Sequence, residues 1–243
     1  MNHGIFKSHS TRFDQSTDRN KKIYTDYLGK KNIPSTNLKY LGFHSYENFL
    51  TEEEKQNLQE YIKCLNMEQR EWGATFREGV VIEVDGHKYK PVAIKKMHPT
   101  LEHLGKRILD FMRLQHEYRE NACFELPEQF DQAYVQKYKP GGELNPHFDE
   151  RSKFQEIIAG ITIQGSSTFV LGLHQAAKAS RKMKSGATKQ LHVHDARAGQ
   201  LYVMSGMSRY DFRHAVYNST DSDRISITFR ALAPNVKQKL SVT

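Results

Sequence analysis

The stretch Tyr134-Val-Gln-Lys-Tyr-Lys-Pro-Gly-Gly-Glu-Leu-Asn-Pro-His-Phe-Asp149 decides how the rest of the chain is interpreted. It begins like a strand, turns at Pro140-Gly141-Gly142 and ends in His147-Phe-Asp149. Residues two apart in an extended backbone point to one face, so His147 and Asp149 can aim at one point. An imidazole and a carboxylate are two of the three ligands in the facial triad that binds non-haem Fe(II). Because most isolated His-x-Asp pairs are surface polar residues, this interpretation needs a third ligand.

A second histidine and a strictly alternating segment follow downstream. The segment from Met204 onward supplies His214, and Arg224 to Arg230 comes next. One face of that last segment is apolar (Ile225, Ile227, Phe229), and the other is polar (Arg224, Ser226, Thr228, Arg230). One interpretation is an edge strand with a wet polar face. The other places the polar face inside a barrel, where the planar forks of two arginines bind a dicarboxylate.

Taken in order, these motifs resemble the AlkB-like family of Fe(II)/2-oxoglutarate dioxygenases. The family pattern of Asn-x-Tyr, Pro-Gly and His-x-Asp is similar to Gln136-Lys-Tyr138, Pro140-Gly141 and His147-Phe-Asp149. Its closing Arg-x-Asn-x-Thr-x-Arg is similar to Arg224–Arg230, and its Gly-x-Ser-Arg to Gly206–Arg209. The resemblance extends from about residue 130 to 232 and is specific for the family rather than for a substrate.

The resemblance implies a role for each motif. His147, Asp149 and His214 would bind Fe(II) and leave open positions for 2-oxoglutarate and O2. Arg224 would hold the distal carboxylate of 2-oxoglutarate, and Arg230 would act nearer the metal. The full set expected to bind the co-substrate is Gln136, Tyr138, Arg224, Ser226 and Arg230. In the family, such a site oxidises N-methyl groups on DNA or RNA bases, in DNA repair or RNA modification, and releases succinate, CO2 and formaldehyde.

Departures from the family pattern leave the substrate open. Gln136 and Ser226 replace two asparagines, and both remain polar. The acidic residue that base-repair members often carry two places after the ligand aspartate is replaced by Arg151, while Glu150 stands one place earlier. Two alternatives therefore remain: a 2-oxoglutarate-dependent hydroxylase or demethylase that acts on a protein, and a non-catalytic nucleic-acid-binding module. An intact metal triad argues against the second alternative.

The expected fold is mainly β with flanking helices (α+β): a double-stranded β-helix, or jelly roll, with supporting N-terminal helices and a hairpin lid. A capping box at Thr51 to Glu54 predicts the start of one helix, and Pro99 predicts a second. Asp85-Gly86 predicts a hairpin turn. We divide the chain into a polar arm (1–36), a support and lid region (37–129), the dioxygenase core (130–233) and a tail (234–243).

Composition narrows the partner and the compartment. The net charge of +8 and a pI near 9.3 fit a polyanionic partner such as methylated nucleic acid. Residues 175–190 are rich in lysine and arginine and form either a solvated insertion or an arm that contacts phosphates. Two cysteines, no signal peptide and no long apolar run indicate an intracellular protein of the cytoplasm or nucleus, not secreted and not in a membrane. We expect a monomer.

Overall fold

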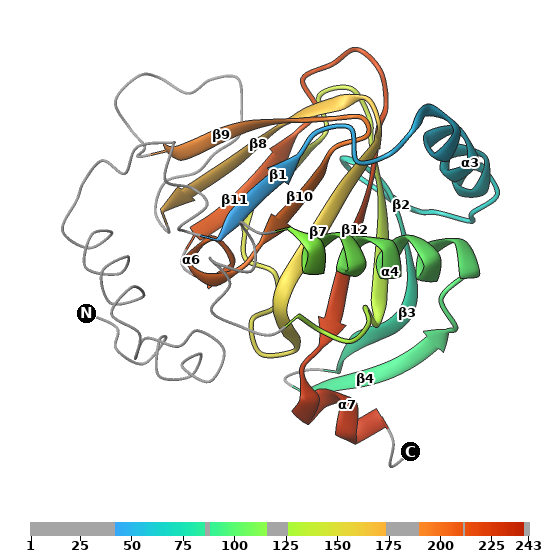
Figure 1. Ribbon diagram of the computed structural model, residues 1–243, viewed down its shortest axis with the longest axis vertical. Helices are drawn as coiled ribbons and strands as arrows, with labels where there is room; N and C mark the ends of the chain where they lie inside the picture. Colours follow the sequence, from blue (N-terminus) through green and yellow to red (C-terminus); the bar gives the residue numbers. More distant parts are fainter. Residues whose placement is uncertain (1–41, 86–87, 116–125, 174–189, 211, 241–243) are drawn as a thin grey trace.

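The computed structural model describes residues 42–85, 88–115, 126–173, 190–210 and 212–240. Their strands form two antiparallel sheets that face each other (Figure 1). The expectation of a mainly β jelly-roll fold with flanking helices is confirmed, because strands dominate and the chain alternates between two facing antiparallel sheets.

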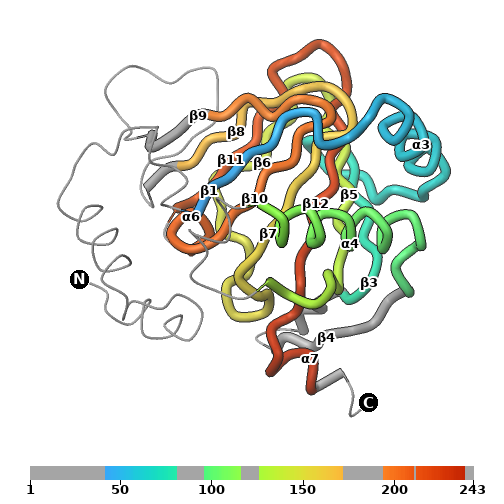
Figure 2. The backbone as a smooth tube through the Cα atoms, viewed as in Figure 1, coloured from blue at the N-terminus to red at the C-terminus, as the bar shows by residue number. Residues whose placement is uncertain are grey.

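The major sheet has eight strands in the order β1-β10-β7-β12-β5-β3-β2, with β4 paired to the far part of β3. Its strands are β1 (Phe43–Tyr46), β2 (Glu68–Arg70), β3 (Gly73–Asp85), β4 (Lys88–Lys95), β5 (Gln132–Tyr138), β7 (Phe154–Gln164), β10 (Leu201–Met204) and β12 (Arg224–Leu232). The trace in Figure 2 shows β1 lying beside β10, although more than half of the chain separates them. The expected hairpin is present as β3 and β4, while its predicted turn residue Gly86 lies outside the described residues.

The minor sheet has four strands in the order β6-β11-β8-β9. They are β6 (Glu143–His147), β8 (Ser166–Leu173), β9 (Gln190–Arg197) and β11 (Phe212–Tyr217). The chain passes repeatedly between the two sheets, so β6 and β11 face the strands that carry the polar residues of β5 and β12. The short helix α6 (Gly206–Tyr210) joins β10 to β11, and α7 (Pro234–Leu240) follows β12.

Two amphipathic helices cover the outer face of the major sheet. The capping box of α3 (Glu52–Lys63) is present, since Thr51 Oγ1 accepts from Glu54 N and the Glu54 carboxylate accepts from Thr51 N. Such a cap contributes about 1 kcal/mol. The second predicted helix is α4 (Pro99–Leu114), which buries an apolar stripe, and Figure 1 shows this helix crossing the sheet. The members of that stripe are Leu101, Leu104, Ile108 and Met112.

This packing settles which way β12 faces. Ile225, Ile227 and Phe229 belong to the same buried cluster as α3 and α4, on the outside of the sheet. Arg224 and the polar residues that alternate with these therefore point into the space between the sheets. β12 is a central strand between β5 and β7, so the alternative of a wet edge strand is wrong.

None of the helices in the described ranges is long and apolar enough to cross a membrane. The arm predicted at 1–36 and the basic segment 175–189 lie outside the described residues. The division of the chain into four regions stays a prediction.

Candidate active site

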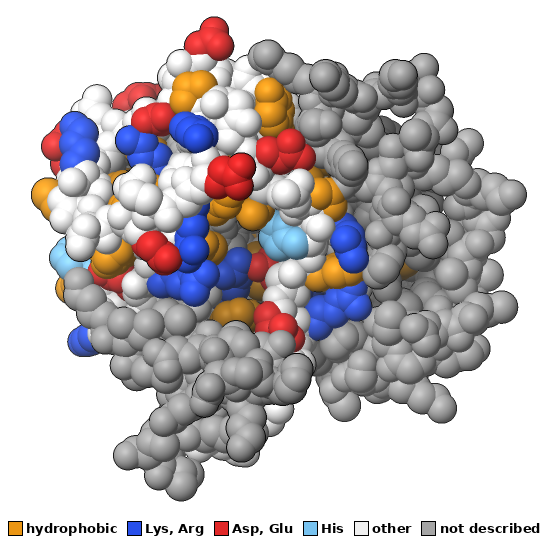
Figure 3. Space-filling model, turned by 180° about the vertical axis from the view of Figure 1, so that it is seen from behind, with side chains coloured by type: hydrophobic (Ala, Val, Ile, Leu, Met, Phe, Trp, Pro, Cys, Tyr) orange, Lys and Arg blue, Asp and Glu red, His pale blue; other side chains and the backbone are white. Residues whose placement is uncertain are grey.

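A cavity of about 350 Å³ lies between the sheets and opens to the surface. Seen from behind, the surface has a hollow in which blue Lys and Arg side chains gather near a pale blue histidine (Figure 3). The cavity is lined by all eight residues that the motifs predicted: Gln136, Tyr138, His147, Asp149, His214, Arg224, Ser226 and Arg230. The sequence interpretation and the fold therefore point to the same place.

Strand register explains why these side chains converge. On β12 and β5, Arg224 lies opposite Tyr138 and Ser226 lies opposite Gln136. Farther along, Thr228 is opposite Tyr134. Because the strands pair without a slip over this stretch, each row contributes side chains to one face. The inner face of the sheet is thus a polar grid, with Arg224 at one end and Arg230 at the other.

The three candidate metal ligands lie together at the junction of the two sheets. His147 at the end of β6 is paired across the sheet with His214 on β11, and their ring centroids are 4.2 Å apart. His214 Nε2 lies 3.6 Å from Asp149 Oδ2. His147 Nδ1 is 2.8 Å from the carbonyl oxygen of Asn145. A proton on Nδ1 donated to that carbonyl leaves Nε2 with the lone pair that a metal ion needs.

As arranged, the three side chains are adjacent rather than closed around one point. Within the part of the chain that the structure describes, no three His, Cys, Asp or Glu side chains have the geometry of a complete metal site. The donor set nevertheless fits a divalent cation. Asp149 Oδ2 is buried and has no hydrogen-bond partner, although a buried carboxylate oxygen normally requires one. A cation beside His214 and Asp149 would satisfy this oxygen.

Electrostatics favour the protonation states that metal ligands require. Burial alone would raise the pKa of Asp149, but the surrounding basic side chains, Arg230 foremost, together outweigh it and the pKa lies below its ordinary value. Burial lowers the pKa of His214 to about 3. Near neutral pH the pair is therefore a carboxylate and a neutral imidazole, the forms that bind Fe(II).

Two arginines fix Asp149 in position. Arg230 pairs with Asp149 Oδ1 and donates to Gln132 Oε1 at 3.0 Å. Arg209 is buried and donates to the backbone carbonyls of Asp149 and Glu150 at 2.7 and 2.8 Å. Arg209 belongs to a motif that resembles the family pattern, but the sequence alone did not predict its role. Its role depends on α6 folding back under the loop after β6, which residue spacing does not reveal.

The closed end of the cavity holds a buried cation without a carboxylate partner. Arg224 is 1 % exposed and donates to Ser226 Oγ at 2.9 Å and to Thr162 Oγ1 at 3.1 Å. Among the described residues it forms no ion pair, and its Nε has no partner. Isolated buried charges are costly, so this guanidinium implies an anionic ligand.

Neighbouring hydroxyls complete the closed end. Gln136 Nε2 donates to Tyr138 Oη at 2.9 Å, and Thr228 Oγ1 donates to Gln136 Oε1 at 3.2 Å. Burial raises the pKa of Tyr138, which keeps its hydroxyl protonated and able to donate. Trp72 stacks on Tyr138 with ring centroids 4.7 Å apart and fixes the orientation of the ring. Gln136, which is one methylene longer than the asparagine of the family pattern, therefore forms its hydrogen bonds with other residues of the polar grid.

Tyr202 enters the cavity over a glycine. Gly160 on β7 pairs with Tyr202 on β10 and with Thr228 on β12. A Cβ atom at Gly160 would lie 2.1 Å from Tyr202 Cζ, so only glycine lets the ring lie across the strand. The tight packing of Tyr202 against β7 was not predictable without the β7–β10 register.

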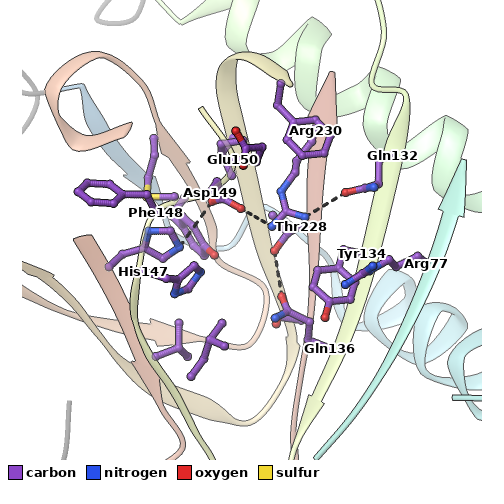
Figure 4. Close-up of a pocket in the computed structure, with 18 of the residues that line it drawn as sticks. Arg77, Gln132, Tyr134, Gln136, His147, Phe148, Asp149, Glu150, Thr228 and Arg230 are labelled. Carbon is purple, nitrogen blue, oxygen red and sulfur yellow. Dashed lines mark hydrogen bonds and ion pairs between the residues drawn. The ribbon is translucent and has the colours of Figure 1, made fainter. Parts of the chain in front are cut away.

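The open end differs in composition. Figure 4 shows Arg77 beside Tyr134, across the pocket from His147 and Asp149. The Arg77 guanidinium lies 4.7 Å from the centre of the Tyr134 ring. On the other side, Arg151 lies 3.5 Å from the centre of the Phe148 ring. Arg151 is therefore stacked on Phe148, whereas Glu150 supplies an acidic side chain to the cavity lining.

The fold and this site define a class: oxygenases built on a double-stranded β-helix with a two-histidine, one-carboxylate set at the mouth of the barrel. The sequence profile of the 2OG-Fe(II) oxygenase superfamily matches residues 42–230. The chain therefore belongs to this superfamily of 2-oxoglutarate- and Fe(II)-dependent oxygenases.

A sequence relative is the uncharacterized protein L905 of Acanthamoeba polyphaga mimivirus, 29% identical over 120 residues. That match covers 45% of this chain and 50% of the viral protein, so the chain spans about half of its relative.

Solved structures share the fold at low sequence identity. OsALKBH1 has a TM-score of 0.55 at 14% identity, covering 78% of this chain and 96% of its own. A prolyl-4-hydroxylase from Pseudomonas putida has a TM-score of 0.52 at 14% identity, covering 82% and 96%. HygX from Streptomyces hygroscopicus, solved with nickel and 2-oxoglutarate, has a TM-score of 0.51 at 13% identity, covering 82% and 86%. At such identities these likenesses concern the fold alone.

Proposed function

We propose that this oxygenase is AlkB-like and removes N-linked methyl groups from bases of DNA or RNA. The observation that carries the proposal is the pair of arginines on β12. Arg224 lies buried at the closed end, and Arg230 pairs with Asp149 at the other end of the same strand face. This two-arginine strand, following His-x-Asp and a distal histidine, is the order that resembles the AlkB-like family. The fold neighbour OsALKBH1 and the net charge of +8 support the same substrate class.

In this proposal each end of the cavity has its own task. His147, Asp149 and His214 hold Fe(II), and Arg209 and Arg230 keep Asp149 in place. Arg224, with the hydroxyls of Ser226, Thr162 and Tyr138 around it, holds the distal carboxylate of 2-oxoglutarate. Gln136 orients the Tyr138 hydroxyl.

When bound, Fe(II) would supply the oxidation of a substrate C–H bond by O2, with one oxygen atom entering the substrate and the other entering succinate as 2-oxoglutarate loses CO2. The chain's own residues exclude water from the closed end and orient the co-substrate. An N-methyl carbon that has been hydroxylated leaves as formaldehyde. Glu150 at the mouth can accept a hydrogen bond from the amino group of a target base, a position that Arg151 does not fill because it is stacked on Phe148.

The experiment is mass spectrometry of single-stranded DNA and RNA oligonucleotides, each with one N-methylated base, after incubation with enzyme, Fe(II) and 2-oxoglutarate. We expect at least one oligonucleotide to lose its methyl group only when 2-oxoglutarate is present. The His214→Ala variant is the matched control and should leave every oligonucleotide unchanged. Intact methyl groups throughout the panel, together with active uncoupled turnover, would contradict the proposal.

A second candidate is hydroxylation or demethylation of a protein. The fold likeness to the Pseudomonas putida prolyl-4-hydroxylase and the basic residue at position 151 favour it. Incubating the same enzyme with peptide libraries and searching for added oxygen tests this candidate in parallel.

We propose further that the enzyme acts as a monomer inside the cell. Cys64 is a free thiol at the surface, which is consistent with a reducing compartment. Sedimentation measurements and localisation of the tagged protein test both statements.

A further inference from the structure

We infer that Arg77 and Tyr134 form a substrate platform at the mouth of the cavity, on which a base of a single-stranded nucleic acid stacks while the guanidinium holds an adjacent phosphate. This inference rests on the proposed function and adds two binding residues to it. In this arrangement a phosphate of the substrate lies on the Arg77 side of the cavity mouth.

The first argument is where the two side chains stand. Arg77 on β3 is paired with Tyr134 on β5, and Tyr134 is paired with Thr228 on β12. Both residues line the cavity that holds Asp149 and His214. Arg77 is thus the next member of the row that forms the polar grid, one strand farther out. Figure 4 shows both side chains across the pocket from His147 and Asp149.

The second argument concerns charge. Three arginines line the cavity: Arg77, Arg224 and Arg230. Arg230 pairs with Asp149, and Arg224 is buried where the dicarboxylate is proposed to bind. Arg77 is exposed and lies over the ring of Tyr134, and it forms no ion pair with a carboxylate of the described residues. Among the described residues, therefore, no carboxylate neutralises this cation, and a phosphate can do so.

The third argument is the geometry of the pair. The Arg77 guanidinium lies 4.7 Å from the centre of the Tyr134 ring, and Arg230 lies 5.5 Å from the same centre. The cation–π interaction holds Arg77 beside the ring, and its planar fork of N–H donors suits a phosphate. Phe148 supplies a second aromatic side chain at the same opening. Aromatic rings beside fixed cations are the combination that binds single strands, since bases stack on the rings while cations bind the backbone. A neutral peptide has no phosphate to pair with the cation and no bases to stack on the rings, so it fits this pair less well than a single-stranded nucleic acid does.

The test is equilibrium binding of a fluorescent single-stranded oligonucleotide with one N-methylated base, measured at several salt concentrations. The full chain is loaded with Mn(II) and 2-oxoglutarate so that no turnover occurs. Four variants are compared with the wild type: Arg77→Ala, Arg77→Lys, Tyr134→Leu and Arg113→Ala. Arg113 is the matched control, because it is an exposed arginine on the far side of the major sheet that pairs with Asp110 at 2.7 Å.

Substitutions of Arg77 and of Tyr134 should change oligonucleotide binding in different ways. Arg77→Ala should weaken binding roughly ten-fold, as expected for the loss of a charge-assisted contact. It should also reduce the salt slope by roughly 0.7, the value for one phosphate on a single strand. Tyr134→Leu should weaken binding roughly five-fold or more through lost stacking and leave the salt slope unchanged. Arg77→Lys should keep the slope, and Arg113→Ala should match the wild type.

Each other outcome overturns the inference. If the wild type binds the oligonucleotide and Arg77→Ala binds it with the same affinity and slope, the platform is wrong while the proposed function stands. A loss in Arg77→Ala that comes only with a lower melting temperature and no change in slope assigns the pair a structural role. If the wild type binds no oligonucleotide at any salt concentration, the proposed function fails as well. Binding of an acidic peptide that Arg77→Ala loses would then assign the cation to a protein substrate.

Discussion

The two ends of the cavity are built on opposite principles. At the closed end, Arg224 is buried, contacts neutral hydroxyls and lies beneath the stacked rings of Tyr138 and Trp72. At the open end, Arg77 and Glu150 are exposed and Phe148 is half-buried. A buried, rigidly held cation suits a small dianion such as 2-oxoglutarate, whereas an exposed rim suits a large substrate. This difference indicates that the closed end determines which co-substrate binds and that the open end determines which substrate binds. Substitutions at either end can test this assignment.

The largest effect is expected where the two ends meet. Replacing His147 or Asp149 by Ala removes a ligand from the proposed iron site, so turnover of 2-oxoglutarate to succinate should fall to background. Circular dichroism should show a largely intact fold for His147→Ala, because that side chain is only half-buried at the end of β6. Succinate formation at the wild-type rate in either variant would remove these residues from the metal site.

A smaller effect is expected at the closed end. Arg224→Lys keeps a positive charge but loses the planar fork that binds a carboxylate through two hydrogen bonds. We expect the KM for 2-oxoglutarate to rise, by an amount that corresponds to about 1.5–3 kcal/mol. Steady-state succinate assays measure it. An unchanged KM would mean that the distal carboxylate of 2-oxoglutarate binds elsewhere and that the closed end is not the co-substrate site.

The smallest effect is expected at the wall between the ends. Gly160→Ala places a methyl group 2.1 Å from the Tyr202 ring, so the ring must move toward the cavity. Overpacking of this kind costs about 1–3 kcal/mol of stability, which denaturant unfolding measures. The double variant Gly160→Ala/Tyr202→Leu should recover part of that loss, because the clash partner is smaller. Additive losses would show that Tyr202 does not press on Gly160.

The closed end could be predicted from the sequence, and most of the open end could not. The alternation from Arg224 to Arg230 and the spacing of Gln136 and Tyr138 assign faces without any knowledge of pairing. Arg77 lies in a distant strand, and only the β3–β5 register brings it beside Tyr134. One signal was present: Tyr134 stands two residues before Gln136 and so shares its face.

The same reasoning holds for the fold. The capping box at Thr51 and the apolar stripe of α4 are local patterns, and both predicted helices are present. Contacts made across the fold were missed: Arg209 beneath the Asp149 backbone, and Tyr202 over Gly160. Helix α7 also stands in the segment expected to be a tail. Local periodicity predicts elements and faces, whereas long-range register decides which side chains meet.

The most direct test is the stoichiometry of products formed from a single-stranded oligonucleotide with one N-methylated base. The enzyme with Fe(II), O2 and 2-oxoglutarate is compared on the methylated and the unmethylated strand, and succinate and formaldehyde are both quantified. Our account predicts that methylation raises both products by equal amounts. Succinate that forms equally with either strand, without formaldehyde, would contradict it.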